Sequence, residues 1–277
     1  MPRPDPPGHD APPSAAAAAA APSTAPVRPG DARPWPAALP PPHDVLGHAV
    51  HPVDLDGAAD LVLRASRGAT PRLVVTLNPE IVVRARGEAG LRAALERADL
   101  TVADGVGLLW AARLAGHRLP GRVPGVDLAT ACMARGGGEL GVYFLGGRPG
   151  VAEAAAAAAR RRWGTRVAGA HHGYFDHEAE GAAIAREVGR SGAQLLLAGL
   201  GERQEVFLDT HRDALGVGAM IGVGGTLDVL AGVARRTPAW TRRWGVEWAW
   251  RVGLDPARWH RVPRLLRFVG LALSRRG

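Results

Sequence analysis

Residues 142–162 read VYFLGGRPGVAEAAAAAARRR, a short apolar run, then a glycine-rich turn, then an alanine-rich run of helical length. This order predicts a strand at 142–145 and a helix at 151–162. Short alternating strands and helices are typical of a mostly parallel sheet with helices on both faces. The sequence therefore predicts an α/β, Rossmann-like fold. The same succession recurs along the chain, where further strands are expected at 73–76, 100–103, 195–198 and 220–223.

The loops that follow parallel strands meet at one edge of the sheet, and ligands bind there. Asp104 directly follows the strand expected at 100–103, and the glycines at 105 and 107 allow a ligand to approach closely. A carboxylate in this position can act as a general base toward a sugar hydroxyl. The alternative interpretation is that Asp104 only caps the next helix.

Gly146 and Gly147 open a Gly-Gly-x-x-Gly sequence between a strand and a helix, the context of a cradle for nucleotide phosphates. The spacing differs from the dinucleotide pattern G-x-G-x-x-G, and a tight turn is the alternative. Asp54-Leu55-Asp56 has the form of a D-x-D metal motif, but helix capping is the preferred interpretation. His171 and His172 are adjacent, and no third ligand stands at metal spacing. A loop contact to substrate or solvent is therefore preferred over a metal site.

The C-terminal residues 235–277 are strongly basic. They contain 11 Arg, two acidic residues and five of the eight Trp of the chain, so residues 1–234 are close to −1 in net charge. Apolar residues at Trp259, Val262, Leu266, Val269 and Leu273 form a stripe flanked by Arg. We expect this Arg/Trp-rich helical appendage to lie on an anionic membrane surface or to close over a polyphosphate. The negative remainder and the lack of a nucleic-acid-binding motif argue against a nucleic-acid partner.

Composition divides the chain into three parts. Residues 1–42 are rich in Pro and Ala and are predicted to be disordered, residues 43–234 form the α/β core, and residues 235–277 form the appendage. The single cysteine, Cys132, allows no intrachain disulfide and fits a reducing cytoplasm. No run approaches 18 apolar residues, so no transmembrane helix is expected.

Nine short sequence blocks occur together in a fixed order and resemble the WecG/TagA/CpsF glycosyltransferases over about residues 44–270. The blocks are TLNPE at 76–80, ADGVG at 103–107, RVPGVD at 122–127, HGYF at 172–175, QE at 204–205, GGTLD at 224–228, RTPAW at 236–240, VEW at 246–248 and DPAR at 255–258. The chain departs from the family pattern at Glu202 and Arg203, where the family usually has Pro and Lys, and at Leu227, where an aromatic is common. These departures leave the identity of the donor sugar open.

The resemblance implies inverting transfer of N-acetylmannosamine, or a related sugar, from its UDP form. The acceptor that it implies is a polyprenyl-diphosphate-linked N-acetylglucosamine at the cytoplasmic face of the membrane, with a product that feeds teichoic acid or other surface glycans. The resemblance implies neither a metal nor a cofactor. It also implies a peripheral membrane location and exchange between oligomer and monomer at the membrane.

The resemblance also implies roles for individual residues. Asp104 is the expected catalytic base, and the tail is expected to close over the site as a lid whose Arg neutralise diphosphate charge. Two alternatives remain beside the main one, namely another UDP-hexose used for exopolysaccharide, and a nucleotide-binding α/β protein without activity whose tail is a membrane anchor. The residues expected to bind substrate are Thr76, Asn78, Arg122, Gly146, Gly147, Tyr174, Gln204, Asp228, Arg251, Arg258 and Arg261.

Overall fold

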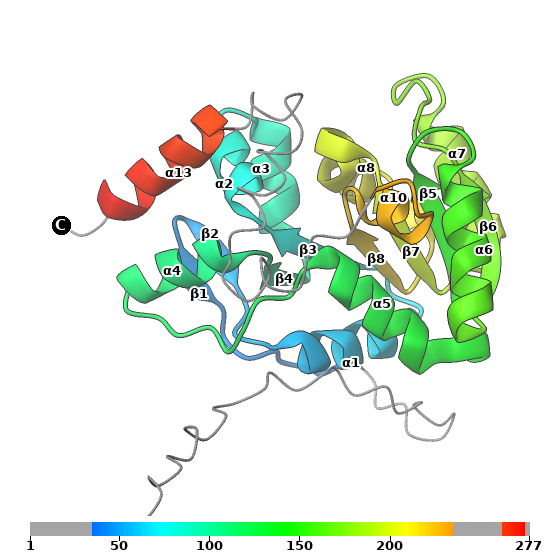
Figure 1. The fold of residues 1–277 in the computed structure, drawn as a ribbon, viewed down its shortest axis with the longest axis horizontal. Coiled ribbons are helices and arrows are strands. Elements are labelled where there is room, and N and C mark those ends of the chain that lie inside the picture. Colours follow the sequence, from blue (N-terminus) through cyan, green and yellow to red (C-terminus); the bar gives the residue numbers. More distant parts are fainter. Residues whose placement is uncertain (1–34, 235–261, 275–277) are drawn as a thin grey trace, which may run out of the picture.

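The structure, a computed structural model, describes residues 35–234 and 262–274 (Figure 1). Its centre is a six-stranded sheet in the order β4-β3-β8-β7-β5-β6, and every neighbouring pair is parallel. The predicted α/β class is therefore confirmed, and each of the five expected strands is present within a residue or two. The strands are β3 (Arg72–Leu77), β4 (Leu100–Ala103), β5 (Gly141–Gly146), β6 (Arg166–His171), β7 (Leu195–Gly199) and β8 (Ala219–Gly222).

Helices cover both faces of the sheet, as the apolar character of the strands requires (Figure 1). One face packs against α1 (Leu55–Ser66), α5 (Gly125–Gly136), α6 (Val151–Trp163) and α10 (Thr226–Leu230). The other packs against α2 (Pro79–Ala85), α3 (Ala89–Glu96), α4 (Val106–Leu114), α7 (Gly181–Arg190), α8 (Gln204–Thr210), α9 (Arg212–Leu215) and α13 (Val262–Ser274).

No local pattern predicted β6, an edge strand with low strand propensity. Its sequence is RVAGAH, and a side chain at Gly169 would overlap the ring of Tyr143 on β5. The small residues of β6 therefore follow from close packing against its neighbour, which depends on tertiary structure and not on local propensity.

A short hairpin of β1 (His43–Val45) and β2 (His48–Val50) also escaped prediction. The residue after it, His51, donates its backbone N–H to the Thr101 carbonyl at 2.8 Å and accepts from the Thr101 N–H at Nδ1, at 3.1 Å. Burial lowers the pKa of His51, which agrees with an acceptor nitrogen. The imidazole thus caps the outer edge of β4 against further strand pairing.

Part of the segment that composition predicts to be disordered packs against the core. Trp35 and Leu39 lie in the segment expected to be disordered up to residue 42, yet both pack against the core, and the Arg72 guanidinium stacks 5.2 Å from the Trp35 ring. Two large apolar side chains are enough to dock a Pro-rich segment, even though the average composition of that segment is typical of disordered chains. Residues 1–34 lie outside the described residues.

The D-x-D sequence is structural. Asp54 is the N-cap of α1 and accepts from the Gly57 N–H at 2.8 Å, so the capping interpretation is confirmed. Asp56 forms an ion pair with the buried Arg135 of α5, which also binds Asp60 at 2.8 Å. This arrangement ties α1 to α5 on the face of the sheet away from α2. Within the described ranges, no helix is long and apolar enough to cross a bilayer.

Candidate active site

The loops after the parallel strands share one edge of the sheet, and the chain leaves neighbouring strands there in opposite directions. After β3 it passes to α2 on one face, and after β8 it passes to α10 on the other. Divergence of this kind opens a crevice at the carboxyl ends of the strands, where ligands of open α/β sheets bind. The contacts described below join residues from four of these loops beside that crevice.

Thr76 lies near the end of β3, at the edge of the sheet where these loops meet. Its Oγ1 donates to the Gly222 carbonyl of β8 at 3.1 Å, and the side chain is buried. A Cβ at Gly125 would stand 3.3 Å from the same oxygen, so the start of α5 also closes on it. The Thr76 hydroxyl is thus fixed with its hydrogen used, and its lone pairs remain as acceptors.

Asn78 follows β3 and caps α2. Its Oδ1 accepts from the N–H groups of Glu80 and Ile81, each at 3.0 Å, which confirms the N-cap predicted from Asn78-Pro79-Glu80. The capping bonds fix the orientation of the amide, because only the oxygen can accept. The Nδ2 group therefore points away from the helix and is the part of Asn78 that can donate to a ligand.

Two substitutions separate these roles of Asn78. We expect Asn78→Ala to lower the free energy of unfolding by about 1 kcal/mol, since the cap is lost. Asn78→Asp keeps the capping oxygen and should unfold like the parent, but it lacks the Nδ2 donor. If Asn78 contacts substrate, Asn78→Asp should raise the donor KM about tenfold, the scale of one hydrogen bond of 1.4 kcal/mol. Chemical denaturation and steady-state kinetics measure the two effects, and an Asp variant with unchanged kinetics would leave Asn78 a cap only.

Asp104 is held beside Asn78 by the backbone. Its N–H donates to the Leu77 carbonyl at 2.7 Å, and Leu77 directly precedes Asn78. The N-cap of α4 is Gly105, with a φ of 104°. Asp104 therefore stands one position before the N-cap, and the positive φ of the next residue explains the glycine.

Arg122 reaches the same place from a different segment. The next residue, Val123, donates its N–H to the Ala103 carbonyl at 2.7 Å, which sets Arg122 alongside Asp104 at the end of β4. Its side chain is half-buried. Backbone contacts thus bring Asn78, Asp104 and Arg122 together, although they come from three segments up to 44 positions apart.

Gln204 enters the site from the loop after β7. It is buried, its Oε1 accepts from the Gly224 N–H at 2.9 Å, and its Nε2 donates to Glu205 Oε1 at 2.7 Å. The Gly224 turn follows β8, the neighbour of β3, so Gln204 joins the loop after β7 to the crevice beside Thr76. The sequence prediction that Gln204 lies at this edge is consistent with these contacts.

Gly146 and Gly147 form a tight turn. A side chain at Gly146, whose φ is 141°, would overlap the Gly199 carbonyl, and the Gly147 N–H already donates to that carbonyl at 3.2 Å. Gly173 donates to the Gly147 carbonyl at 2.8 Å, which draws in the loop after β6. The geometry of the tight turn accounts for both glycines, in agreement with the alternative interpretation. Their contact with substrate stays a prediction.

Tyr174 and Asp228 lie at the same edge. Tyr174 is 65% exposed and borders a hollow of about 650 Å³ between the loops that follow β6 and β7. Asp228 is half-buried in the first turn of α10. Contact of either residue with the substrate stays a prediction. The hollow is lined by Gly173, Tyr174, Phe175, Asp176, His177, Glu180, Leu200, Glu202 and Arg203.

The C-terminal helix α13 docks onto the loops that carry the site. Arg264 Nη1 binds Glu80 Oε1 at 2.7 Å and Glu202 Oε1 at 2.5 Å. These carboxylates stand two residues after Asn78 and two residues before Gln204. Figure 1 shows α13 (red) beside α2. The predicted Arg251, Arg258 and Arg261, like the Trp at 240, 244 and 248, lie outside the described residues.

Phe268 anchors the same helix in the core. It is 1% exposed, and its ring is so close to α4 that a Cβ on Gly107 would stand 3.2 Å from it. Ala272, one turn further, is also buried. The stripe predicted from the sequence lies on the opposite side of the helix, and this second apolar face was not predicted. No local signal could have found the Arg264 contacts, whose partners are 184 and 62 residues away.

The Arg264 contacts should stabilise the docked position of α13 and slow its amide hydrogen exchange. We expect Arg264→Met to speed amide hydrogen exchange in residues 265–274 by about fivefold, because a partly exposed ion pair contributes about 1 kcal/mol or less. Arg267→Met on the exposed side of the same helix is the matched control and should leave exchange unchanged. Equal exchange in the two variants would mean that Phe268 alone holds the helix.

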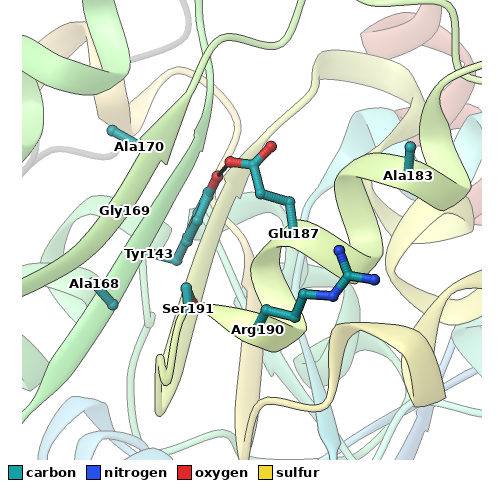
Figure 2. A pocket seen from close by; sticks show the side chains of 8 residues that line it. All are labelled: Tyr143, Ala168, Gly169, Ala170, Ala183, Glu187, Arg190 and Ser191. Atoms are coloured by element: carbon teal, nitrogen blue, oxygen red, sulfur yellow. Dashed lines mark hydrogen bonds between the residues drawn. The ribbon is translucent and has the colours of Figure 1, made fainter.

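A second hollow lies elsewhere, between the edge strand β6 and α7 (Figure 2). It measures about 560 Å³, and the Tyr143 hydroxyl donates to Glu187 Oε1 at 2.5 Å across it. Burial and this carboxylate raise the pKa of Tyr143, so the phenol stays protonated. None of the predicted substrate-binding residues lines this hollow, which we therefore separate from the candidate site.

A comparison with protein families agrees with the resemblance carried by the nine blocks. The sequence model described as "Glycosyl transferase WecG/TagA/CpsF family" matches residues 43–277. The match begins at the first residue of β1, and it includes every loop at the site edge and the whole C-terminal segment. The chain therefore belongs to the WecG/TagA/CpsF family of glycosyltransferases.

Proposed function

We propose that the protein transfers N-acetylmannosamine, or a related sugar, from a UDP-sugar to a polyprenyl-diphosphate-linked N-acetylglucosamine, with inversion at the anomeric carbon. The observation that carries the proposal is the position of Asp104. This carboxylate stands at the sheet edge beside Asn78 and Arg122, one position before the N-cap of the helix that follows, and α13 is docked over the neighbouring loops. The family supplies the reaction class, and the donor and acceptor proposed here are those that the sequence resemblance implies.

In the proposed reaction, Asp104 takes the proton from the acceptor hydroxyl as its oxygen attacks the anomeric carbon. The bond between that carbon and the diphosphate oxygen breaks on the opposite face, and UDP leaves with the bonding electrons. The leaving group is a polyanion, and guanidinium groups can stabilise it through charge-assisted, bidentate hydrogen bonds. We assign this role to Arg251, Arg258 and Arg261 of the C-terminal segment.

The acceptor is a membrane lipid, and α13 offers a surface suited to a membrane. Its exposed side carries Leu266, Val269 and Leu273, which are 67%, 37% and 47% exposed, while Phe268 and Ala272 hold its other side on the core. The exposed Arg267 lies among them. An apolar face with basic residues favours the surface of an anionic bilayer. We therefore place the protein at the inner face of the cell membrane, peripherally bound.

Replacing Leu266, Val269 and Leu273 together by Gln should weaken binding to anionic liposomes at least tenfold, because each buried aliphatic side chain contributes more than 1 kcal/mol. Val233→Gln, at an apolar position 68% exposed elsewhere, is the control and should bind normally. Co-sedimentation with vesicles of stated anionic content measures the difference. Unchanged binding by the triple variant would move the membrane contact away from α13.

The transfer itself is tested with a panel of UDP-sugars and a synthetic lipid-diphosphate-linked N-acetylglucosamine. We expect release of UDP and formation of a disaccharide lipid with at least one donor of the N-acetylhexosamine class. Efficient transfer from another UDP-hexose would instead support the exopolysaccharide alternative. Absence of UDP release with every donor and acceptor, while UDP still binds, would favour the nucleotide-binding protein without activity.

A further inference from the structure

Gln204 and Glu205 fill a space that the sheet leaves for them. They begin α8, directly under the end of β8, and are 6% and 2% exposed. A Cβ at Gly222 would stand 2.8 Å from Gln204 Nε2 and 3.2 Å from Glu205 Oε1. The missing side chain at Gly222 thus lets both polar side chains reach the edge of the sheet beside the Gly224 turn.

The orientation of the Gln204 amide follows from its partners. The Gly224 backbone N–H can only donate, so the atom 2.9 Å from it must be Oε1. Nε2 then faces Glu205 Oε1, which must accept, at 2.7 Å. One Nε2 hydrogen is used in this bond, and the other has no acceptor among residues 35–234 and 262–274. That second hydrogen is the one Gln204 can offer to a ligand.

Glu205 can accept the hydrogen bond from Gln204 Nε2 as a neutral acid. Its Oε2 is buried and has no hydrogen-bond partner in the described part of the chain, a costly environment for an ionised carboxylate. Burial raises the pKa of Glu205, and the bond from Gln204 and the nearby Arg84 oppose this only in part. Arg84 is itself engaged by Glu88 at 2.7 Å and by the Glu202 carbonyl at 2.6 Å. A protonated Glu205 still accepts from Gln204 through Oε1.

We propose that Glu205 is a positioning residue for the transfer reaction, which acts through Gln204 by fixing the amide so that its second Nε2 hydrogen faces the donor sugar. This inference rests on the proposed function and extends it to a residue without a role so far. The Gly224 N–H holds Oε1 and the Glu205 carboxyl holds Nε2, so the amide is fixed at both ends and the donor meets it in one orientation. A buried amide with only one fixed end would be free to rotate and would lose part of its binding energy on each encounter.

The test compares Glu205→Gln with Glu205→Met in the full chain. The Gln variant retains a neutral acceptor, so we expect its kcat/KM for the donor within threefold of the parent. The Met variant has similar volume and no acceptor, and we expect kcat/KM for the donor to fall about 10- to 100-fold, mainly through KM, with the KM for the lipid acceptor unchanged. In a Gln204→Met background, the Glu205→Met change should have little further effect, because the two residues act as one unit.

Three results would overturn the inference: an active Met variant within threefold of the parent, a Gln variant as impaired as the Met variant, or multiplicative losses in the double variant. A readout without turnover separates these outcomes from failure of the proposed function. In the parent, the Glu205 carboxyl carbon should show the NMR shift of a protonated acid at pH 7, and the Gln204 side-chain amide should exchange slowly. Glu205→Met should abolish that protection whether or not the protein transfers sugar, and an unprotected amide in the parent would end the inference by itself.

Discussion

Asp104→Asn is expected to lower the rate of sugar transfer by about 1,000-fold, within the range that a positioned general base contributes. Asn has nearly the same shape, and the backbone contact between Asp104 and Leu77 does not involve the side chain. The fold should therefore be unaffected. An amide cannot take the proton of the acceptor hydroxyl, so the acceptor attacks as a neutral alcohol. Affinity for UDP should stay within about threefold, because the diphosphate is bound by other groups.

Single-turnover transfer and calorimetric UDP binding measure the two quantities for this variant. Asp213→Asn is a suitable control, since Asp213 is an exposed acid in the first turn of α9 and belongs to no predicted site. Its transfer rate should match the parent. Transfer by Asp104→Asn within threefold of the parent would show that another group removes the proton.

Removal of residues 235–277 is expected to reduce transfer at least 100-fold while the sheet stays folded. All six strands of the sheet lie between residues 72 and 222, so the α/β core keeps its own hydrogen bonding. The truncated chain loses Arg251, Arg258 and Arg261, which we assign to the departing diphosphate, and each lost charge-assisted hydrogen bond contributes about 1.5–3 kcal/mol. It also loses α13 and with it the exposed apolar side chains that we propose to contact the membrane.

The truncation also has a structural cost. Phe268 is fully buried against the core, and its removal should lower the free energy of unfolding by about 2–3 kcal/mol. The substitution of Gln for Arg251, Arg258 and Arg261 in the full chain separates the two effects, because α13 is kept. We expect this variant to lose activity to a similar degree and to unfold like the parent. A truncated chain with full activity, measured as UDP release, would rule out any catalytic role of the C-terminal segment.

Much of the fold could be read from local patterns, because buried parallel strands and the glycines after them have a strong signature. The segment 142–162 illustrates this, since its strand and helix are observed as β5 and α6. β6 lacked that signature because its small residues are required by close packing against the Tyr143 ring on the neighbouring strand. The packing of Trp35 and Leu39 was not predicted, because the average composition of their Pro-rich segment is typical of disorder.

The site was predictable to the extent that it lies in loops after strands. Asn78 and Asp104 follow paired residues of β3 and β4, so their proximity follows once the sheet is known. The hydrogen bonds that orient these side chains and the docking of α13 do not follow from the sheet alone. Arg264 meets Glu80 across 184 residues, and Gln204 meets Gly224 only because β7 and β8 are neighbours. Contacts of this kind depend on tertiary geometry that no short motif encodes.

The most direct test of the account is a crystal structure of the full chain with UDP and a lipid-diphosphate-linked N-acetylglucosamine analogue. We predict that an Asp104 carboxylate oxygen lies within about 2.6–3.2 Å of the attacking acceptor hydroxyl, the reach required of a general base. In the same complex, Arg side chains from residues 251–261 should bind the UDP diphosphate. A complex with the acceptor hydroxyl far from Asp104, or with the diphosphate bound away from that segment, would contradict the account.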